Sequence, residues 1–197
     1  MFLPMKVLII GPLGAGKSTL AYQLNKKFNL SRLNLDEVCR IKENGKYRTQ
    51  REQTALIRKF LMTHPAWVVE GCQKNLYKQV DPDLIIDMRI HRLVAIFRFT
   101  KRFFKARKLI GKEIPPDLPV QAYHYRPITL SKIRDWDKTN RAINTQIGSF
   151  LKTTSIPVIC CRGYKDYAKV FQYLKKSNLL HPNIKREWIL YSTPDYT

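Results

Sequence analysis

The sequence predicts an α/β protein built on a parallel β-sheet with helices on both of its faces. Short runs of Val, Leu and Ile alternate with segments of helical spacing along most of the chain, and this alternation is typical of parallel sheets. A glycine-rich turn joins the first apolar run to the first helical segment. With 197 residues, of which 44% are hydrophobic, the chain is long enough for one well-packed domain.

Five apolar runs are the expected strands, because each is short and is bounded by turn or polar residues. They cover residues 5–10, 33–35, 67–69, 84–86 and 156–160.

Helices are expected between these strands, where apolar residues recur at helical spacing. One of them begins behind the capping box Thr49-x-x-Glu52 and stops before Pro65. The others are expected over residues 17–28, 91–109, about 130–151 and 164–176. The segment 111–127 contains four prolines and is therefore expected to be a loop-like insert.

The chain is strongly basic, with 36 Lys and Arg against 15 Asp and Glu and a formal net charge of +21. Such a charge attracts polyanions, which include nucleotides, nucleic acids and anionic membranes. No apolar run has the length of a membrane helix, and the N-terminus lacks the layout of a signal peptide. The four cysteines form no CxxC pair, which favours reduced thiols and a cytoplasmic location.

The strongest signal is the pattern G-x-x-x-x-G-K-[ST], with the expected strand before it and the expected helix after it. Glycines let phosphate oxygens approach the backbone N–H groups, and the following helix adds its positive N-terminal end. Lys17 would supply a cation to the β- and γ-phosphates, and the Ser18 hydroxyl would bind Mg²⁺. The alternative is a tight turn that happens to be rich in glycine. The residues expected to bind ATP are Gly11, Pro12, Gly14, Ala15, Gly16, Lys17, Ser18 and Thr19.

Beyond this motif, the chain resembles the nucleoside monophosphate kinase family. The resemblance rests on GPLGAGKST, on Asp36 after a short second strand, on WVVEG, on the basic stretch RLVAIFRFTKRFFKARK and on a terminal strand–helix pair. It is closest to the short adenylate-kinase-like branch that is often labelled DNA topology modulation proteins. It covers residues 5–176, and the phosphate loop is its one specific motif.

This resemblance implies the three-layer P-loop NTPase fold, with a five-stranded parallel sheet and a small helical lid. The kinase-like domain would span residues 1–176, with a basic lid or insert at about 98–135. Residues 177–197 would form a C-terminal tail to which the sequence assigns no role.

The resemblance also implies roles near the end of the strand beside the loop. Adenylate kinases have D-G-F-P-R there, and this chain has Glu70-Gly71-Cys72-Gln73-Lys74. Glu70 would help to position Mg²⁺, unless it is a surface carboxylate at a strand end. Lys74 would hold a phosphate of the acceptor, without the bidentate fork of an arginine.

Asp36 and Arg40 lie where the family's acceptor site begins. Their four-residue spacing puts both on one helical face if the chain is helical there. Asp36 would then orient a base or sugar, and Arg40 would hold a phosphate. The alternative is that Asp36 is an N-cap and Arg40 is an exposed arginine.

Residues 88–112 include nine Lys or Arg and no acidic residue. Arg98 and Arg102 are four residues apart, like the first two lid arginines of the resembled family, which neutralise the charge that develops during phosphoryl transfer. Arg134 and Arg141 would complete this set, although a solvated basic surface is the alternative for each arginine. An apolar stripe would lie on another side of this helix, formed by Leu93, Ile96, Phe97, Thr100 and Phe104. The resemblance also places Arg162 and Gly163 beside the adenine.

These observations predict an ATP- and Mg²⁺-dependent phosphotransferase whose acceptor is a nucleoside monophosphate or a similar small molecule. Lys17 and the four lid arginines would stabilise the transferred phosphoryl group. Two other functions stay open. One is an ATP-responsive nucleic-acid-binding protein that uses the basic helix, and the other is a small-molecule kinase of the shikimate or gluconate type. The sequence predicts no membrane partner and does not indicate an oligomeric state.

Overall fold

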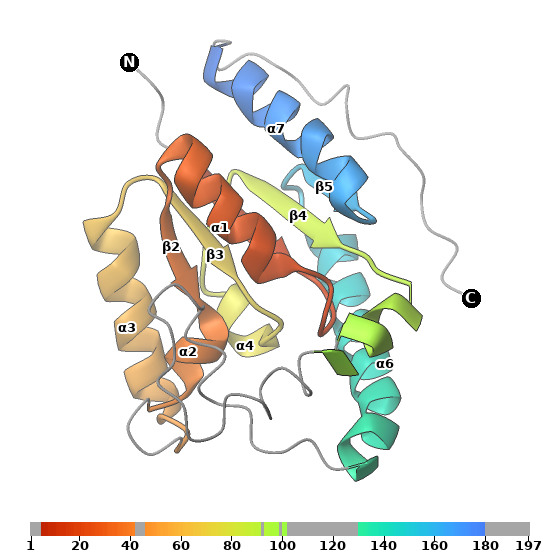
Figure 1. Ribbon diagram of the computed structural model, residues 1–197. Helices are drawn as coiled ribbons and strands as arrows, with labels where there is room; N and C mark the ends of the chain where they lie inside the picture. The colour runs from red at the N-terminus through yellow and green to blue at the C-terminus, as the bar shows by residue number, and fades with distance from the viewer. Residues whose placement is uncertain (1–4, 42–45, 92, 99, 102–129, 180–197) are drawn as a thin grey trace, which may run out of the picture.

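The computed structural model describes residues 5–41, 46–91, 93–98, 100–101 and 130–179, and for residues 130–134, 137 and 177–179 it describes the backbone alone (Figure 1). Five strands form one parallel sheet in the order β2-β3-β1-β4-β5. The strands are β1 (Lys6–Ile10), β2 (Ser31–Asn34), β3 (Trp67–Glu70), β4 (Leu84–Met88) and β5 (Val158–Cys161). The predicted α/β class and five-stranded parallel sheet are therefore confirmed.

Helices cover both faces of the sheet, as Figure 1 shows. The helices are α1 (Lys17–Phe28), α2 (Leu35–Cys39), α3 (Gln50–Thr63), α4 (Lys74–Tyr77), α6 (Leu130–Thr153) and α7 (Tyr164–Leu179). Residues 93–98 and 100–101 are also helical.

Two apolar clusters hold these layers together, because successive side chains of a strand point to opposite faces. Val7 and Ile9 of β1 pack with residues of α1 and α7 on one face. Leu8 and Ile10 pack on the other face, with residues of α3 and α6 that include Ile57 and Ile147. Strands that are buried on both faces are typical of a parallel sheet.

The elements begin and end close to the predicted residues, and the differences have local causes. The second strand is Ser31–Asn34 rather than 33–35, because Leu35 already begins α2. The fifth strand begins at Val158, just after Pro157, whose missing N–H cannot join a ladder. The capping box at Thr49 is confirmed. The Thr49 hydroxyl oxygen accepts from the Glu52 N–H, and the Glu52 carboxylate accepts from the Thr49 N–H. The short helices α2 and α4 were not predicted.

The predicted insert at residues 111–127 and most of the predicted C-terminal tail lie outside the described residues. Within the part of the chain that is described, no helix combines the length and the apolar character that crossing a bilayer requires.

Candidate functional site

The glycine-rich loop (residues 11–19) leaves the carboxyl end of β1 and leads into α1. Three of its glycines have positive φ, with values of 152° at Gly11, 81° at Gly14 and 97° at Gly16. A Cβ on Gly11 would lie 2.5 Å from the Met88 carbonyl oxygen, so neither its φ nor the available space suits a larger residue. Gly16 caps α1 without a side-chain hydrogen bond. The first backbone N–H groups of α1 therefore face the loop without help from a capping side chain.

The side chain of Lys17 folds back onto the glycine-rich loop. Its side chain is buried, with 7% of the residue exposed. Its Nζ donates to the carbonyl oxygens of Gly11 at 2.9 Å and Pro12 at 3.0 Å. An ammonium group held by two carbonyl oxygens is a positive charge fixed at the carboxyl end of the sheet, where the open α/β folds bind their ligands.

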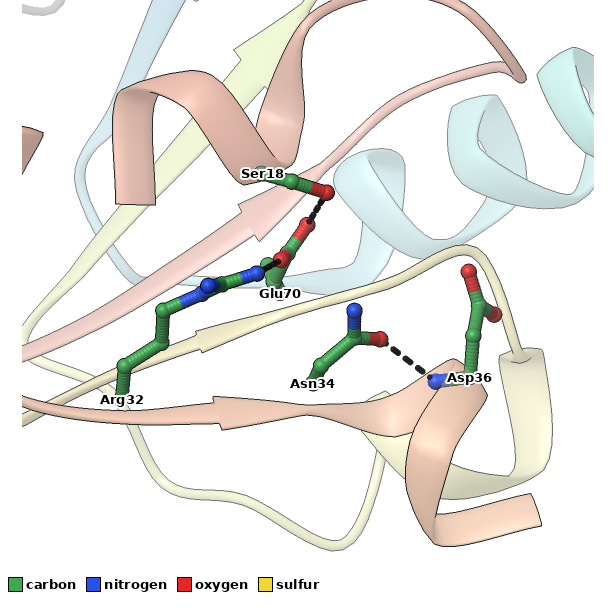
Figure 2. Close-up of polar contacts among 5 residues, drawn as sticks. All are labelled: Ser18, Arg32, Asn34, Asp36 and Glu70. Atoms are coloured by element: carbon green, nitrogen blue, oxygen red, sulfur yellow. Dashed lines mark hydrogen bonds and ion pairs between the residues drawn. The ribbon is translucent and has the colours of Figure 1, made fainter. Parts of the chain in front are cut away.

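A short chain of polar contacts connects this loop to β3 and, beyond it, to β2 (Figure 2). The Ser18 hydroxyl donates to Glu70 Oε2 at 2.8 Å, and Arg32 Nη2 donates to Glu70 Oε1 at 2.5 Å. The Glu70 residue is 1% exposed, so it is not the surface carboxylate of the alternative interpretation. Arg32 reaches it from β2, since Arg32 and Glu70 extend from the same face of adjacent strands.

Side chains from three other helices contact backbone atoms of the glycine-rich loop. The Leu13 N–H donates to Oδ1 of the buried Asn140 on α6 at 3.0 Å. The Tyr167 hydroxyl of α7 donates to the Gly16 carbonyl oxygen at 3.4 Å. Arg98 Nη1 lies 3.3 Å from the Gly14 carbonyl oxygen.

Sequence reasoning singled out Arg98 and missed Asn140 and Tyr167. A polar residue at position 140, in the middle of an expected helix, carries no local signal that it faces a loop 127 residues away.

The Arg98 guanidinium also lies over the Tyr164 ring, 5.2 Å from its centroid. Such a cation–π contact orients the planar group. Arg102 lies outside the described residues, as does the side chain of Arg134. Arg141 is exposed, next to Asn140 in the chain.

Among the described residues, the predicted apolar stripe is half-buried at Ile96 and Thr100 and exposed at its other two positions. Leu93 and Phe97 are 68% and 66% exposed, whereas Ala95 is 1% exposed. A Cβ on Gly14 would lie 3.4 Å from the Ala95 carbonyl oxygen, so the helix approaches the glycine-rich loop with a small residue. This close approach is what brings Arg98 within reach of the loop. Phe104 lies outside the described residues.

The structure corrects the predicted relation between Asp36 and Arg40. Helix α2 ends at Cys39, and Arg40 is extended with φ −120° and ψ 144°, so the two residues do not share a helical face. Arg40 Nη2 instead donates to the Tyr47 hydroxyl at 2.5 Å, and its guanidinium lies over that ring. Asp36 is not the N-cap of α2 either. Asn34 caps that helix, because its Oδ1 accepts from the Asp36 N–H at 2.8 Å.

Asp36 lies in the first turn of α2. Burial raises the pKa of the Cys72 thiol to about 11; the Asp36 carboxylate adds to this rise, and the Lys17 ammonium opposes it. Lys74 is half-buried at the start of α4.

A second buried carboxylate, to which sequence reasoning assigned no role, is the next-to-last residue of β4. Asp87 is 3% exposed and accepts from Arg89 Nε at 2.6 Å, and its Oδ1 has no partner among the described residues. Burial raises the pKa of Asp87, and Arg89 opposes the rise.

The adenine contact at Arg162 and Gly163, in the loop after β5, stays a prediction. A Cβ on Gly163 would meet no atom of the protein within 4 Å, so the glycine is not required by packing. The Arg162 N–H donates to Asp166 Oδ2 at 2.8 Å, which closes a turn at the start of α7. Together, the loop and its neighbours place four kinds of group at the carboxyl end of the sheet. These are backbone N–H groups, the Lys17 ammonium, the Ser18 hydroxyl and the buried Glu70 carboxylate.

Comparison with known proteins adds no assignment to this geometry. Neither a protein-family model nor a curated protein matches the chain.

Proposed function

We propose that this protein is an ATP-dependent phosphotransferase of the P-loop type. The observation that carries the proposal is the glycine-rich loop itself, with three glycines at positive φ between β1 and α1 and with Lys17 buried against the loop. Loops of this sequence and backbone form cradle phosphates with backbone N–H groups, and the lysine reaches the outer phosphates. The nucleotide's triphosphate would lie over residues 11–19.

The pair Ser18 and Glu70 suits Mg²⁺. The Ser18 hydroxyl donates its hydrogen to Glu70, and a hydroxyl bonded in this way can turn its oxygen, rather than its hydrogen, toward a cation. Mg²⁺ in phosphoryl-transfer enzymes is held by one or two side chains together with phosphate oxygens and water, and it does not need a cage of three carboxylates. Such an ion would neutralise charge on the phosphates. Within the described residues, no cluster of three or more His, Cys, Asp or Glu offers a competing metal site.

Arg98 fits the role of an arginine that faces the transferred phosphoryl group. It reaches the glycine-rich loop from a separate helix, and its nearest partners in the absence of nucleotide are the carbonyl oxygens of Gly14 and Ala15, at 3.3 and 3.5 Å. Carbonyl oxygens are weaker partners for a guanidinium than phosphate oxygens. We therefore expect Arg98 to exchange these contacts for the nucleotide's phosphates.

The acceptor would bind beside β2 and β3, near Asp36 and Lys74. No side chain has to act as a strong base, because this kind of transfer depends mainly on positioning and on neutralisation of charge.

The test is equilibrium titration with ATP and Mg²⁺, followed by ADP release with a panel of nucleoside monophosphates, shikimate and gluconate. Lys17→Ala should lower ATP affinity by at least tenfold and abolish ADP release, and its unfolding midpoint is measured to verify that the variant is folded under the assay conditions. Lys26→Ala is the matched control, since it removes the same charge from the exposed far end of α1. Absence of saturable ATP binding in the unaltered chain, or full activity in Lys17→Ala, would refute the proposal.

Nucleic-acid binding is a second candidate function, which the net charge of +21 favours. Binding of this kind weakens steeply with salt, because it releases counterions. Titration with duplex DNA at several salt concentrations separates it from nucleotide binding, which should lack that steep slope.

A further inference from the structure

Asn34 carries a buried hydrogen-bond donor with no partner among the described residues. The residue is 5% exposed, and its Oδ1 accepts from the Asp36 N–H at 2.8 Å. Because a backbone N–H can only donate, this bond fixes the amide with its oxygen toward α2 and its nitrogen on the opposite side. That nitrogen, Nδ2, is the atom without a partner. A buried donor that lacks an acceptor is costly, so its retention needs an explanation.

The donor is directed toward the candidate acceptor site. Asn34 and Glu70 are register partners on adjacent parallel strands, so their side chains leave the same face of the sheet. Figure 2 shows the amide nitrogen of Asn34 and the carboxylate of Asp36 both directed to the side on which Ser18 lies. We call the space beside Asn34 and Asp36 the β2 corner.

The charges around the β2 corner select the kind of ligand group that it accepts. The Asp36 carboxylate would repel an anionic group, and the Glu70 carboxylate is already paired with Arg32. The arginines of this region have other partners, since Arg32 is paired with Glu70 and Arg40 with Tyr47. A hydroxyl group suits the corner, because it can accept from the Asn34 amide and donate to the Asp36 carboxylate at the same time.

We propose that the β2 corner binds a hydroxyl group of the phosphoryl acceptor, with Asn34 Nδ2 as donor and Asp36 as acceptor of hydrogen bonds. This inference rests on the proposed phosphotransferase function and specifies its acceptor as a hydroxyl-bearing molecule. The hydroxyl belongs either to the sugar of a nucleotide or to a non-nucleotide polyol, and the experiment separates these two sources.

The decisive variants are Asn34→Asp and Asn34→Ser. Aspartate keeps an oxygen that can cap α2 and replaces the donor with a second oxygen. Serine also caps helices well, is uncharged, and is too short to present the amide donor. Each variant is compared with the unaltered chain for ATP affinity, for the acceptor KM and kcat by ADP release, and for the unfolding midpoint.

The probes are AMP, its 2′-deoxy and 3′-deoxy analogues, shikimate and gluconate. We expect both variants to raise the KM of the preferred probe by about tenfold or more, with ATP affinity unchanged. If the hydroxyl is on the ribose, the KM of one deoxy analogue with the unaltered chain should be as high as the KM of AMP with the variants. The variants should then raise the KM of that analogue little further. If it is on a polyol, AMP and its analogues should be poor acceptors throughout.

Two results would overturn the inference while leaving the proposed function intact. One is ATP binding together with an acceptor KM that neither variant changes, even if the unfolding midpoint falls, because Asn34 would then be only a helix cap. The other is ATP binding with no probe that either raises ADP release or shifts the NMR signal of the Asn34 side-chain amide. Absence of ATP binding in the unaltered chain would instead refute the proposed function.

Discussion

We expect the two partners of the ion pair between Arg32 and Glu70 to differ in how much stability is lost when each is substituted. Their closest atoms are 2.5 Å apart, and the side chain of Glu70 is 2% exposed, whereas that of Arg32 is 23% exposed. When one partner of a buried pair is removed, the cost comes mostly from the charge that is left behind without compensation. The two possible single substitutions leave different charges behind, and they should therefore differ in cost.

Arg32→Met leaves a carboxylate that is almost fully buried, with the Ser18 hydroxyl as its remaining partner. Breaking a buried pair costs about 3–5 kcal/mol, and the Ser18 bond places this case near 3 kcal/mol. Glu70→Gln leaves an arginine that already reaches solvent, and the amide oxygen still accepts a hydrogen bond from it. That loss should be about 1 kcal/mol.

The assay is urea unfolding at pH 7, with Arg58→Met on the exposed side of α3 as the control for loss of a positive charge. Equal losses in the two variants, or no loss in Arg32→Met at pH 7, would refute this reasoning.

Three further predictions concern residues around the site. Burial raises the pKa of Asp87 above its ordinary value, so the folded state binds this proton more tightly than the unfolded chain, and stability increases as the pH falls through the folded pKa. Asp87→Asn should consequently unfold at the same or a higher urea concentration at pH 7, and a lower midpoint would contradict this. Asn140→Ala leaves the Leu13 N–H without its partner and should weaken ATP binding several-fold by titration, and an unchanged affinity would contradict this. Thr49→Ala removes the cap of α3 and should lower the free energy of unfolding by about 1 kcal/mol, as measured in urea.

The parts of the fold that could be predicted are those with local signals. The strands are short apolar runs, and the capping box at Thr49 and the glycines before Lys17 mark the starts of two helices. Each of these signals depends on residues that are close together in the sequence, so it can be recognised without knowledge of the fold.

The residues that sequence reasoning missed depend on contacts over long sequence distances. Asn140 and Tyr167 meet the glycine-rich loop from 127 and 151 residues away, and Arg32 meets Glu70 from 38 residues away. Nothing beside these residues in the chain shows what they face. Arg40 was placed wrongly for a related reason: the four-residue spacing assumed that α2 continues, but the helix ends one residue earlier.

The strand order explains why Glu70 connects the two halves of the candidate site. Strand β3 lies between β1 and β2, so Glu70 has Ile9 as its register partner on one side and Asn34 on the other. From this position one carboxylate meets the Ser18 hydroxyl, which follows β1, and the Arg32 guanidinium, which extends from β2. A shorter side chain at the end of β3 would break the contacts that connect the glycine-rich loop to β2. It follows that substitutions of Glu70 should affect nucleotide binding and acceptor binding together, whereas Asn34 substitutions should affect the acceptor alone.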